Sequence, residues 1–238
     1  SANDQTALCD SVKAAQAAGV KVVTFDSDAP TCRDLFINQA TSEGIAKVLV
    51  EMAVDQSGGS GEVAVLSATA NATNQNAWID AMKKSLAADH PDIKLVDVVY
   101  GDDQDQKSFD ETQALLQKHP KLKVIVAPTT VGIAAAARYI STSDAKGKVM
   151  VTGLGTPNDM RAFVKDGTVK EFALWNPEEL GYLTVHAIKA LADGTIKGAE
   201  GDKFTAGKLG DYTVGANQTV LLGDPYKFNA ENIDNFNF

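Results

Sequence analysis

Hydrophobic residues follow two alternating patterns along this chain. Short, nearly continuous apolar runs are typical of buried strands, and they alternate with segments whose apolar residues recur at the i, i+3, i+4, i+7 spacing of helices. In the segment Ser42–Gln56, for example, the residues Ile45, Val48, Leu49 and Met52 share one face. This alternation predicts an α/β fold with parallel sheets and helices on both faces.

The predicted elements are bounded by residues that start and stop them. Pro157 follows a threonine cap, and Asn176 with Glu179 can form a capping box. The expected strands are Val22–Phe25, Val63–Ser67, Leu95–Tyr100, Val124–Ala127, Val149–Gly153 and Val169–Leu174, with short ones at Tyr212–Val214, Thr219–Leu222 and Tyr226–Phe228. The expected helices are Asp4–Ala18, Ser42–Gln56, Phe109–Lys118, Val131–Ile140 and Pro177–Ala192, with a further one starting at Pro157.

The chain opens on a predicted helix without a strand before it. In a parallel sheet a helix normally crosses over from a preceding strand. Ser1–Asp4 would then be the residues that connect this helix to a strand that precedes this sequence. We therefore expect N-terminal βα structure to be missing from it.

Length and charge narrow the classes of protein to consider. The 238 residues are 44% hydrophobic, which allows one or two domains with sizeable cores. The net charge of −9 speaks against nucleic acid as a partner, because phosphate binding needs clustered Lys and Arg. No apolar run approaches the roughly 20 residues of a membrane helix.

The two cysteines, Cys9 and Cys32, leave two interpretations open. They lie in the first predicted helix and just after the following strand, so a disulfide between them is geometrically plausible and would suit an oxidising compartment. Alternatively, both are ordinary small apolar residues. Their spacing does not suggest zinc, and no metal or cofactor is expected.

Polar residues follow several of the predicted parallel strands. Asp26 ends the first strand, Asn74 and Gln75 follow the second, and Thr130 follows another. Asn176 follows a fourth strand in the same way, and we call each such position a strand exit. Ligands of α/β sheets bind outside the carboxyl ends of the strands, so these side chains can converge on one crevice.

The chemistry at these exits favours binding over catalysis. None of them carries a nucleophile beside a base, and the sequence lacks a nucleophile elbow, a phosphate loop and a zinc-protease motif. A carboxylate such as Asp26 accepts strong, charge-assisted bonds from vicinal hydroxyls. Trp175 is either a core residue or a platform for the apolar face of a ligand. We expect a non-enzymatic site for a hydroxylated ligand.

Five segments resemble one known family. They read VVTFDSD (Val22–Asp28), FINQAT (Phe36–Thr41), NQNAW (Asn74–Trp78), TGLGTPNDMRAFVKDGTVKEFALWNPEELGYLTV (Thr152–Val185) and NIDNFNF (Asn232–Phe238). The chain is similar over essentially its whole length to the type I periplasmic sugar-binding proteins of bacterial ABC importers. Within them it looks closest to the rhamnose-binding branch, with the autoinducer-2-binding proteins as near relatives.

The resemblance implies two Rossmann-like lobes joined by a hinge of three crossings, which close on a sugar. The crossings would lie near Phe36–Ala40, near Leu174–Asn176 and after Gly194. The N-terminal lobe would comprise residues 1–38 and 176–206, and the C-terminal lobe residues 39–175 and 207–238. About two further βα units, at roughly 30 residues per unit, would precede Ser1 and complete the N-terminal lobe.

The resemblance also implies a set of ligand contacts. By position these are Asp26, Asn38, Asn74, Gln75, Pro128, Thr130 and Asn176, to which we add Trp175. The autoinducer-2 branch has an aspartate in place of Asn74 and an alanine in place of Thr130. Both departures favour a plain sugar, with rhamnose first.

The resemblance implies an extracytoplasmic solute-binding protein that captures a monosaccharide in the interlobe cleft and delivers it to the permease of an ABC importer. We expect a monomer in the periplasm or outside the cell, with or without a lipid anchor. Three alternatives remain open: autoinducer-2 uptake, the ligand-sensing domain of a sugar-responsive regulator, and an α/β enzyme that acts on a sugar.

Overall fold

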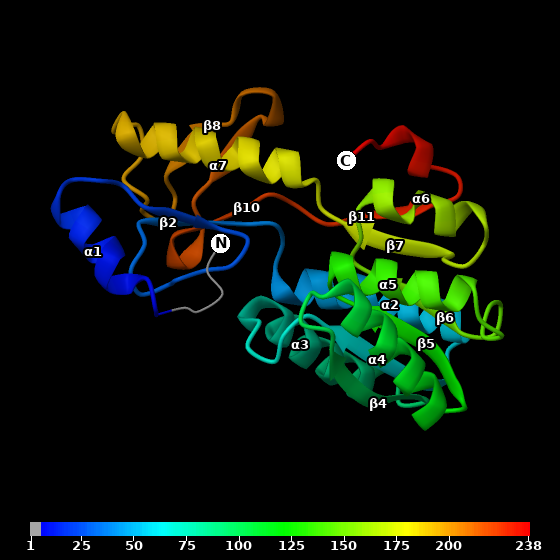
Figure 1. Cartoon of the computed structure of the whole chain (residues 1–238). Coiled ribbons are helices and arrows are strands. Elements are labelled where there is room, and N and C mark those ends of the chain that lie inside the picture. Colours follow the sequence, from blue (N-terminus) through cyan, green and yellow to red (C-terminus); the bar gives the residue numbers. More distant parts are fainter. Residues whose placement is uncertain (1–5) are drawn as a thin grey trace. The chain divides into compact units, whose positions relative to one another are not determined.

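The computed structural model describes residues 6–238, which form two compact units. Unit 1 contains the chain up to Thr41 together with Trp175–Asp224, and unit 2 contains Ser42–Leu174 together with Pro225–Phe238. Figure 1 shows the elements of both units along the chain.

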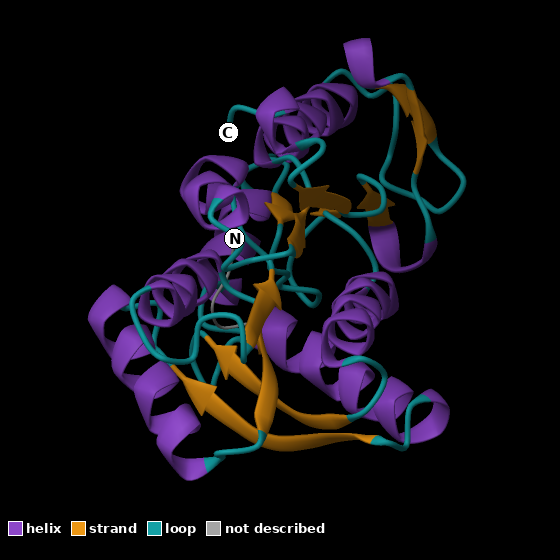
Figure 2. Ribbon diagram, turned by 90° about the vertical axis from the view of Figure 1, so that its right-hand side faces the viewer, coloured by secondary structure: helices purple, strands orange, loops and turns teal. Residues whose placement is uncertain are grey.

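Unit 2 is built on a parallel sheet with the strand order β4-β3-β5-β6. Figure 2 shows helices on both sides of these strands. The strands are β3 (Gly61–Ser67), β4 (Ile93–Tyr100), β5 (Leu122–Ala127) and β6 (Met150–Gly153), and the helices are α2 (Ser42–Ser57), α3 (Thr73–Asp89), α4 (Asp105–Lys118), α5 (Thr130–Ser141) and α6 (Pro157–Lys165). Helix α2 packs on α3, and α4 packs on α5, so each pair covers one face.

The strand order of unit 2 contains a reversal that matters for the site. From β3 the chain crosses to β4 on one side, and from β4 it returns past β3 to β5 on the other side. Right-handed crossovers then place α3 and α5 on opposite faces of the sheet. The neighbouring strands β3 and β5 therefore flank a topological switch point, where α/β proteins bind ligands.

Unit 2 is completed by an antiparallel pair, β7 (Glu171–Leu174) with β11 (Tyr226–Asn229), and by the short helix η3 (Ile233–Asn235). A parallel bridge from Leu154 to Ala173 attaches this pair to the end of β6. Two phenylalanines of the pair, Phe172 and Phe228, are fully buried with ring centroids 5.1 Å apart. The C-terminal residues of the chain thus close the core of unit 2.

Unit 1 has a parallel sheet of three strands in the order β1-β2-β10. Helix α7 packs on β1 and β2 through buried side chains such as Leu180 and Leu183. The strands are β1 (Val23–Phe25), β2 (Leu35–Asn38) and β10 (Thr219–Leu221), with the antiparallel pair β8 (Lys203–Thr205) and β9 (Asp211–Thr213). The helices are α1 (Cys9–Ala17), α7 (Pro177–Ala192) and the short η1 (Gly207–Leu209) and η2 (Ala216–Gln218).

The structure confirms the predicted α/β class with parallel sheets, and it departs from the sequence-based boundaries by more than three residues in three places. Helix α4 begins at Asp105 rather than Phe109, because Asp105 and the three residues after it form its first turn. Helix α1 is described from Cys9 to Ala17, and the expected connection to a preceding strand at Ser1–Asp4 lies outside the described residues.

The third difference is the last crossing between the units. We expected residues 207–238 to join the segment 39–175, but residues as far as Asp224 belong to unit 1. The reason is strand pairing: β9 pairs with β8, and β10 pairs in parallel with β2. The crossing therefore falls at Pro225, directly before β11.

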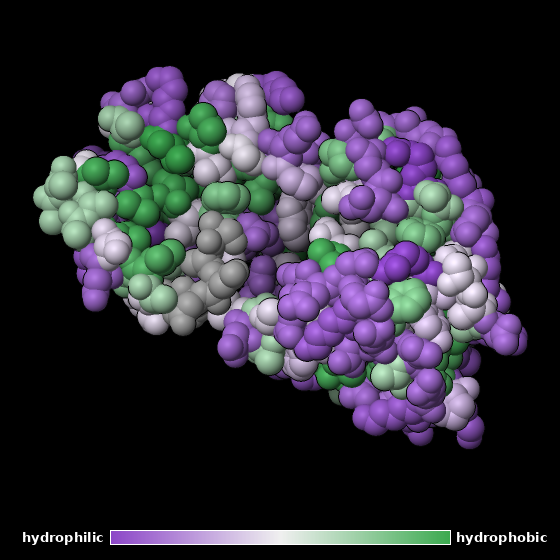
Figure 3. Space-filling model, in the orientation of Figure 1, coloured by the Kyte–Doolittle hydropathy of each residue, from purple (hydrophilic) through white to green (hydrophobic). Residues whose placement is uncertain are grey.

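Exposed apolar side chains are distributed unevenly between the units. Among residues 6–238, the large hydrophobic side chains that face solvent are Leu8, Val20, Phe25, Val185, Ile188 and Leu221 in unit 1 and Tyr226 in unit 2. Figure 3 shows apolar surface over the strands and helices of unit 1. Within the part of the chain that is described, no helix has the length and hydropathy needed to cross a bilayer.

Candidate functional site

Unit 2 brings two of the predicted polar exits together. Strands β3 and β5 are neighbours, with Val65 opposite Val126 in the register. Asn74 and Gln75 lie in the first turn of α3, which follows β3, and Thr130 is the first residue of α5, which follows β5. These side chains therefore stand at the carboxyl edge of the sheet on both sides of the switch point.

Hydrogen bonds fix the orientation of both amides at the exit of β3. The Gln75 Oε1 atom accepts from Ser67 Oγ at 2.7 Å and from the backbone N–H of Ala68 at 2.9 Å. The Asn74 Oδ1 atom accepts from the backbone N–H of Gln75 at 2.8 Å. Each carbonyl oxygen thus stabilises the local backbone, which leaves the amide NH2 group of each residue as its contribution to a ligand.

The exit of β5 is held by an aspartate from the exit of β4, which lies on the other side of β3 in the sheet. Thr129 donates from Oγ1 to Asp103 Oδ1 at 2.5 Å, directly before Thr130, and Pro128 is buried beside it. Asp102 and Asp103 both have left-handed backbones, with φ of 54° and 51°. Such residues are strained and cluster at functional sites. The sequence does not predict a role for Asp103, because an acidic loop before a helix is usually a solvated helix start.

Unit 1 brings Asp26 and Asn38 to one edge of its sheet. Asp26 directly follows β1, Asn38 ends β2, and Phe25 lies opposite Ile37 in the register. The backbone of Asp26 is left-handed, with φ of 65°, and its N–H donates to the carbonyl of Ile37 at 3.1 Å. The Asn38 carbonyl accepts from the N–H of Leu222, so the backbone at this exit is paired on both sides.

Trp175 and Asn176 begin the second segment of unit 1. The Asn176 Oδ1 atom accepts from the backbone N–H groups of Glu178 at 2.9 Å and Glu179 at 3.3 Å, so Asn176 is the N-cap of α7. Trp175 is half-buried and packs against the core of this unit. Asn176 can offer a ligand the two donors of its NH2 group while its oxygen caps the helix.

Three of the predicted amides therefore share one feature. The carbonyl oxygens of Asn74, Gln75 and Asn176 all accept backbone or hydroxyl hydrogens within their own unit. What these residues can present to a ligand is donors, whereas the carboxylate of Asp26 can only accept. A sugar hydroxyl both donates and accepts, so it can satisfy either kind of group.

The cysteines form a disulfide in unit 1. Cys9 and Cys32 are joined with their Cα atoms 5.3 Å apart, and both are buried together with Ala29. The bond attaches the loop that follows Asp26 to α1. Among residues 6–238, no group of three or more His, Cys, Asp or Glu is arranged to hold a metal ion.

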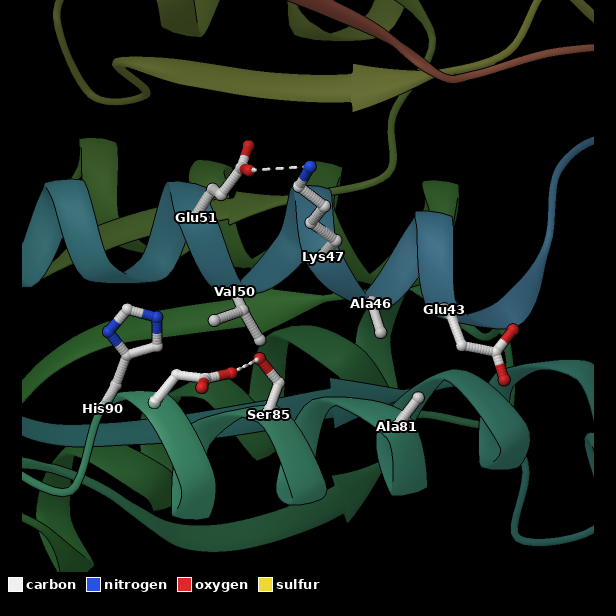
Figure 4. A pocket seen from close by; sticks show the side chains of 9 residues that line it. Glu43, Ala46, Lys47, Val50, Glu51, Ala81, Ser85 and His90 are labelled. Carbon is white, nitrogen blue, oxygen red and sulfur yellow. Dashed lines mark hydrogen bonds and ion pairs between the residues drawn. The ribbon is translucent and has the colours of Figure 1, made fainter.

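Two further hollows of unit 2 do not contain any predicted site residue. One groove of about 460 Å³ lies between α2 and α3, and its walls include Ala46, Val50 and Ala81. Figure 4 shows Ala46 and Val50 of α2 facing Ala81 of α3, while Lys47 and Glu51 pair above α2 in this view. The other, of about 490 Å³, is lined by residues such as Pro120 and Val149 at the amino ends of β5 and β6.

The architecture defines a class of protein. The chain crosses three times between two α/β units, and each unit has polar side chains at the carboxyl edge of a parallel sheet. This architecture is typical of solute-binding proteins. A sequence model described as "Periplasmic binding protein domain" matches residues 1–196. The chain therefore belongs to the periplasmic binding protein family, among the sugar-binding proteins of ABC transporters.

Solved structures agree with this assignment. A sugar ABC transporter protein from Actinomyces odontolyticus is 61% identical with a TM-score of 0.85, over 98% of this chain and 75% of that one. A solute-binding protein from Clostridium phytofermentas with bound L-rhamnose is 41% identical with a TM-score of 0.92, over 98% and 77%. LsrB from Clostridium saccharobutylicum in complex with AI-2 shares the fold at 24% identity, with a TM-score of 0.91 over 100% and 81%.

Proposed function

We propose that this protein binds L-rhamnose, or a closely similar monosaccharide, outside the cytoplasm and delivers it to the permease of an ABC importer. The observation that carries the proposal is the relative from Clostridium phytofermentas, which holds L-rhamnose and is 41% identical. In this role the protein carries out no chemical reaction on its ligand.

We assign the ligand contacts to the predicted polar set. Asp26 accepts hydrogen bonds from ligand hydroxyls, and the NH2 groups of Gln75 and Asn176 donate to ligand oxygens. Their oxygens are already engaged, which supports this assignment of donors. The remaining contacts are Asn38, Asn74, Pro128, Thr130 and Trp175.

The chemistry of a deoxyhexose suits this set. Such a sugar presents several hydroxyls and one methyl group, so its site needs polar groups on most sides and an apolar surface on one. The half-buried ring of Trp175 offers that apolar surface. The amides and the carboxylate of the set supply the polar groups for the hydroxyls.

Calorimetric titration tests the proposal directly. We expect L-rhamnose to bind, and we expect Asp26→Ala to weaken binding by at least about 100-fold, because charged hydrogen bonds contribute about 1.5 to 3 kcal/mol each. Asp55→Asn is the matched control, since Asp55 is an exposed aspartate on α2. A parent protein that does not bind L-rhamnose or any related aldose contradicts the proposal.

Two comparators separate the alternatives. Binding of AI-2 without L-rhamnose would assign the protein to the autoinducer branch and would mean that Asn74 and Thr130 do not exclude that ligand. A product formed from any bound sugar would point to an enzyme. In our proposal the ligand is recovered unchanged after each titration.

A further inference from the structure

The loop that carries Asp26 is held in an unfavourable backbone conformation. Asp26 has φ of 65°, in the left-handed region that side chains other than glycine rarely adopt. The next N–H, that of Ser27, turns back to the carbonyl of Phe25 at 2.7 Å. A conformation of this kind persists only where the surrounding structure enforces it.

The enforcing contacts converge on the next acidic residue, Asp28. Its Oδ1 atom accepts from Thr24 Oγ1 at 2.6 Å, from the backbone N–H of Ala29 at 2.8 Å and from Arg33 Nε at 3.0 Å. Its Oδ2 atom accepts from Arg33 Nη2 at 2.9 Å. The pair is bidentate, and the Arg33 side chain is only 2% exposed, so the geometry of the loop is tightly specified.

Arg33 extends this network across the sheet. Its Nη1 atom donates to Gln218 Oε1 at 3.3 Å, and its guanidinium lies 5.9 Å from the centre of the Phe36 ring. Phe36 stands in the middle strand, opposite Thr24 of β1 on one side and opposite Thr219 of β10 on the other. Arg33 therefore connects the loop after β1 with the turn before β10.

We propose that Asp28 and Arg33 are positioning residues, which hold Asp26 in the conformation that binds the ligand. The inference rests on the proposed function, in which Asp26 accepts hydrogen bonds from the sugar. Asp28 binds both sides of the turn, at Thr24 before Asp26 and at Ala29 after it. Without this clamp the left-handed residue relaxes, and the carboxylate of Asp26 leaves its place at the strand exit.

The loop offers a matched control for a purely structural role. Asp34 is a second aspartate of the same loop, and it also supports the backbone, because its Oδ2 atom accepts from the N–H of Val22 at 2.8 Å and from Gln16 Nε2 at 3.0 Å. These contacts lie at the start of β1, away from its exit. The disulfide at Cys32 keeps the loop attached to α1 in either variant.

The experiment is a double-mutant cycle read by calorimetry with L-rhamnose, with melting temperatures measured in parallel. We expect Asp28→Asn to weaken binding at least about tenfold, and Asp34→Asn to lower the melting temperature while changing affinity less than about threefold. In the Asp26→Asn background, Asp28→Asn should add little, because the group that it positions is already lost. Arg33→Lys keeps the positive charge but cannot donate two parallel hydrogen bonds to Asp28, so it should weaken binding as Asp28→Asn does. It replaces Asp28→Asn in the experiment if that variant does not fold.

The other outcomes overturn the inference in distinguishable ways. Additive effects of Asp26→Asn and Asp28→Asn mean that Asp28 acts independently of Asp26. Equal losses of affinity in the Asp28 and Asp34 variants mean that the loop has only a structural role. If the parent protein binds L-rhamnose and Asp26→Asn binds it equally well, Asp26 is not a ligand contact and the inference has no basis. If the parent protein does not bind L-rhamnose, the proposed function itself is wrong.

Discussion

Unit 2 supports its strand exits by helices packed on both faces of its sheet, whereas unit 1 adds a disulfide and a buried ion pair at the exit that carries Asp26. In unit 2 the sheet whose strands lead to Gln75 and Thr130 is covered by helices on both faces, and most residues of its central strands β3 and β5 are buried. In unit 1 the described sheet that ends at Asp26 has three strands, which share a buried core with α7 that includes Leu35 and Val220. The loop at this edge is held by a disulfide and by the buried pair of Arg33 with Asp28.

The difference shows that similar polar edges can be kept rigid by unlike means. Burial in a packed core fixes an exit because any displacement opens a cavity. Cross-links add to packing by limiting the conformations that the chain can adopt. The two units should therefore respond differently to core mutations, to reduction and to pH.

The largest effect should come from a cavity in unit 2. Ile125→Ala empties a site in the middle of β5 that is 0% exposed, so we expect the free energy of unfolding of unit 2 to fall by about 4 kcal/mol. Hydrogen exchange followed by mass spectrometry separates the units, and peptides from unit 1 should keep their protection. Equal loss of protection in both units would mean that they unfold as one.

The second effect concerns the disulfide in unit 1. Replacing Cys9 and Cys32 by serine opens a cross-link between residues 23 positions apart, which should destabilise unit 1 by about 3 kcal/mol. The same measurement should show faster exchange in β1 and β2 and unchanged exchange in β3 and β5. Protection lost mainly in unit 2 would mean that the disulfide does not stabilise unit 1 selectively.

A smaller effect tests the two uses of Asn176. Asn176→Ala removes the cap of α7 and should cost about 1 kcal/mol of stability as well as affinity for the sugar. Asn176→Asp keeps a capping oxygen but loses the NH2 group, so melting temperature should be retained while affinity falls. If Asn176→Asp binds as the parent does, the residue is a cap and not a ligand contact.

The smallest effect is the pH dependence of a surface cluster on unit 2. Hydrogen bonds from Lys118 and then His119 hold the pKa of Asp97 below its ordinary value of 3.8. A lowered pKa means that Asp97 stabilises the fold above 3.8 and that this contribution disappears as the pH falls through the lower folded value. Asp97→Asn should therefore cost about 0.5 to 1 kcal/mol at neutral pH and nothing in strong acid, as urea titrations at the two pH values can show.

Local signals in the sequence predicted the elements well where caps were present. Helix α7 runs from Pro177 to Ala192 as predicted, because Asn176 and Pro177 mark its start without ambiguity. The crossing at Pro225 was misplaced because the pairing of β10 with β2 joins residues far apart in the chain. No local pattern records such a pairing.

The candidate site was predictable in its positions but not in its orientations. The sequence predicted that Asp26, Gln75 and Thr130 follow the carboxyl ends of strands, because the alternation of strands and helices shows where each strand ends. The direction of each amide depends on hydrogen bonds such as that from Ser67 to Gln75, which only folding brings together. The hydrogen bonds of Asp28 were not predicted either, because charged residues in a loop are usually solvated.

The engaged oxygen of Asn74 bears on how such a site can change its ligand over evolutionary time. An aspartate at this position could keep the bond to the N–H of Gln75 with one oxygen and turn the other toward the ligand. One substitution would then replace a donor by a charged acceptor and leave the surrounding backbone intact. New specificity would arise without loss of stability, and a transport protein could pass from one ligand to another through variants that all fold.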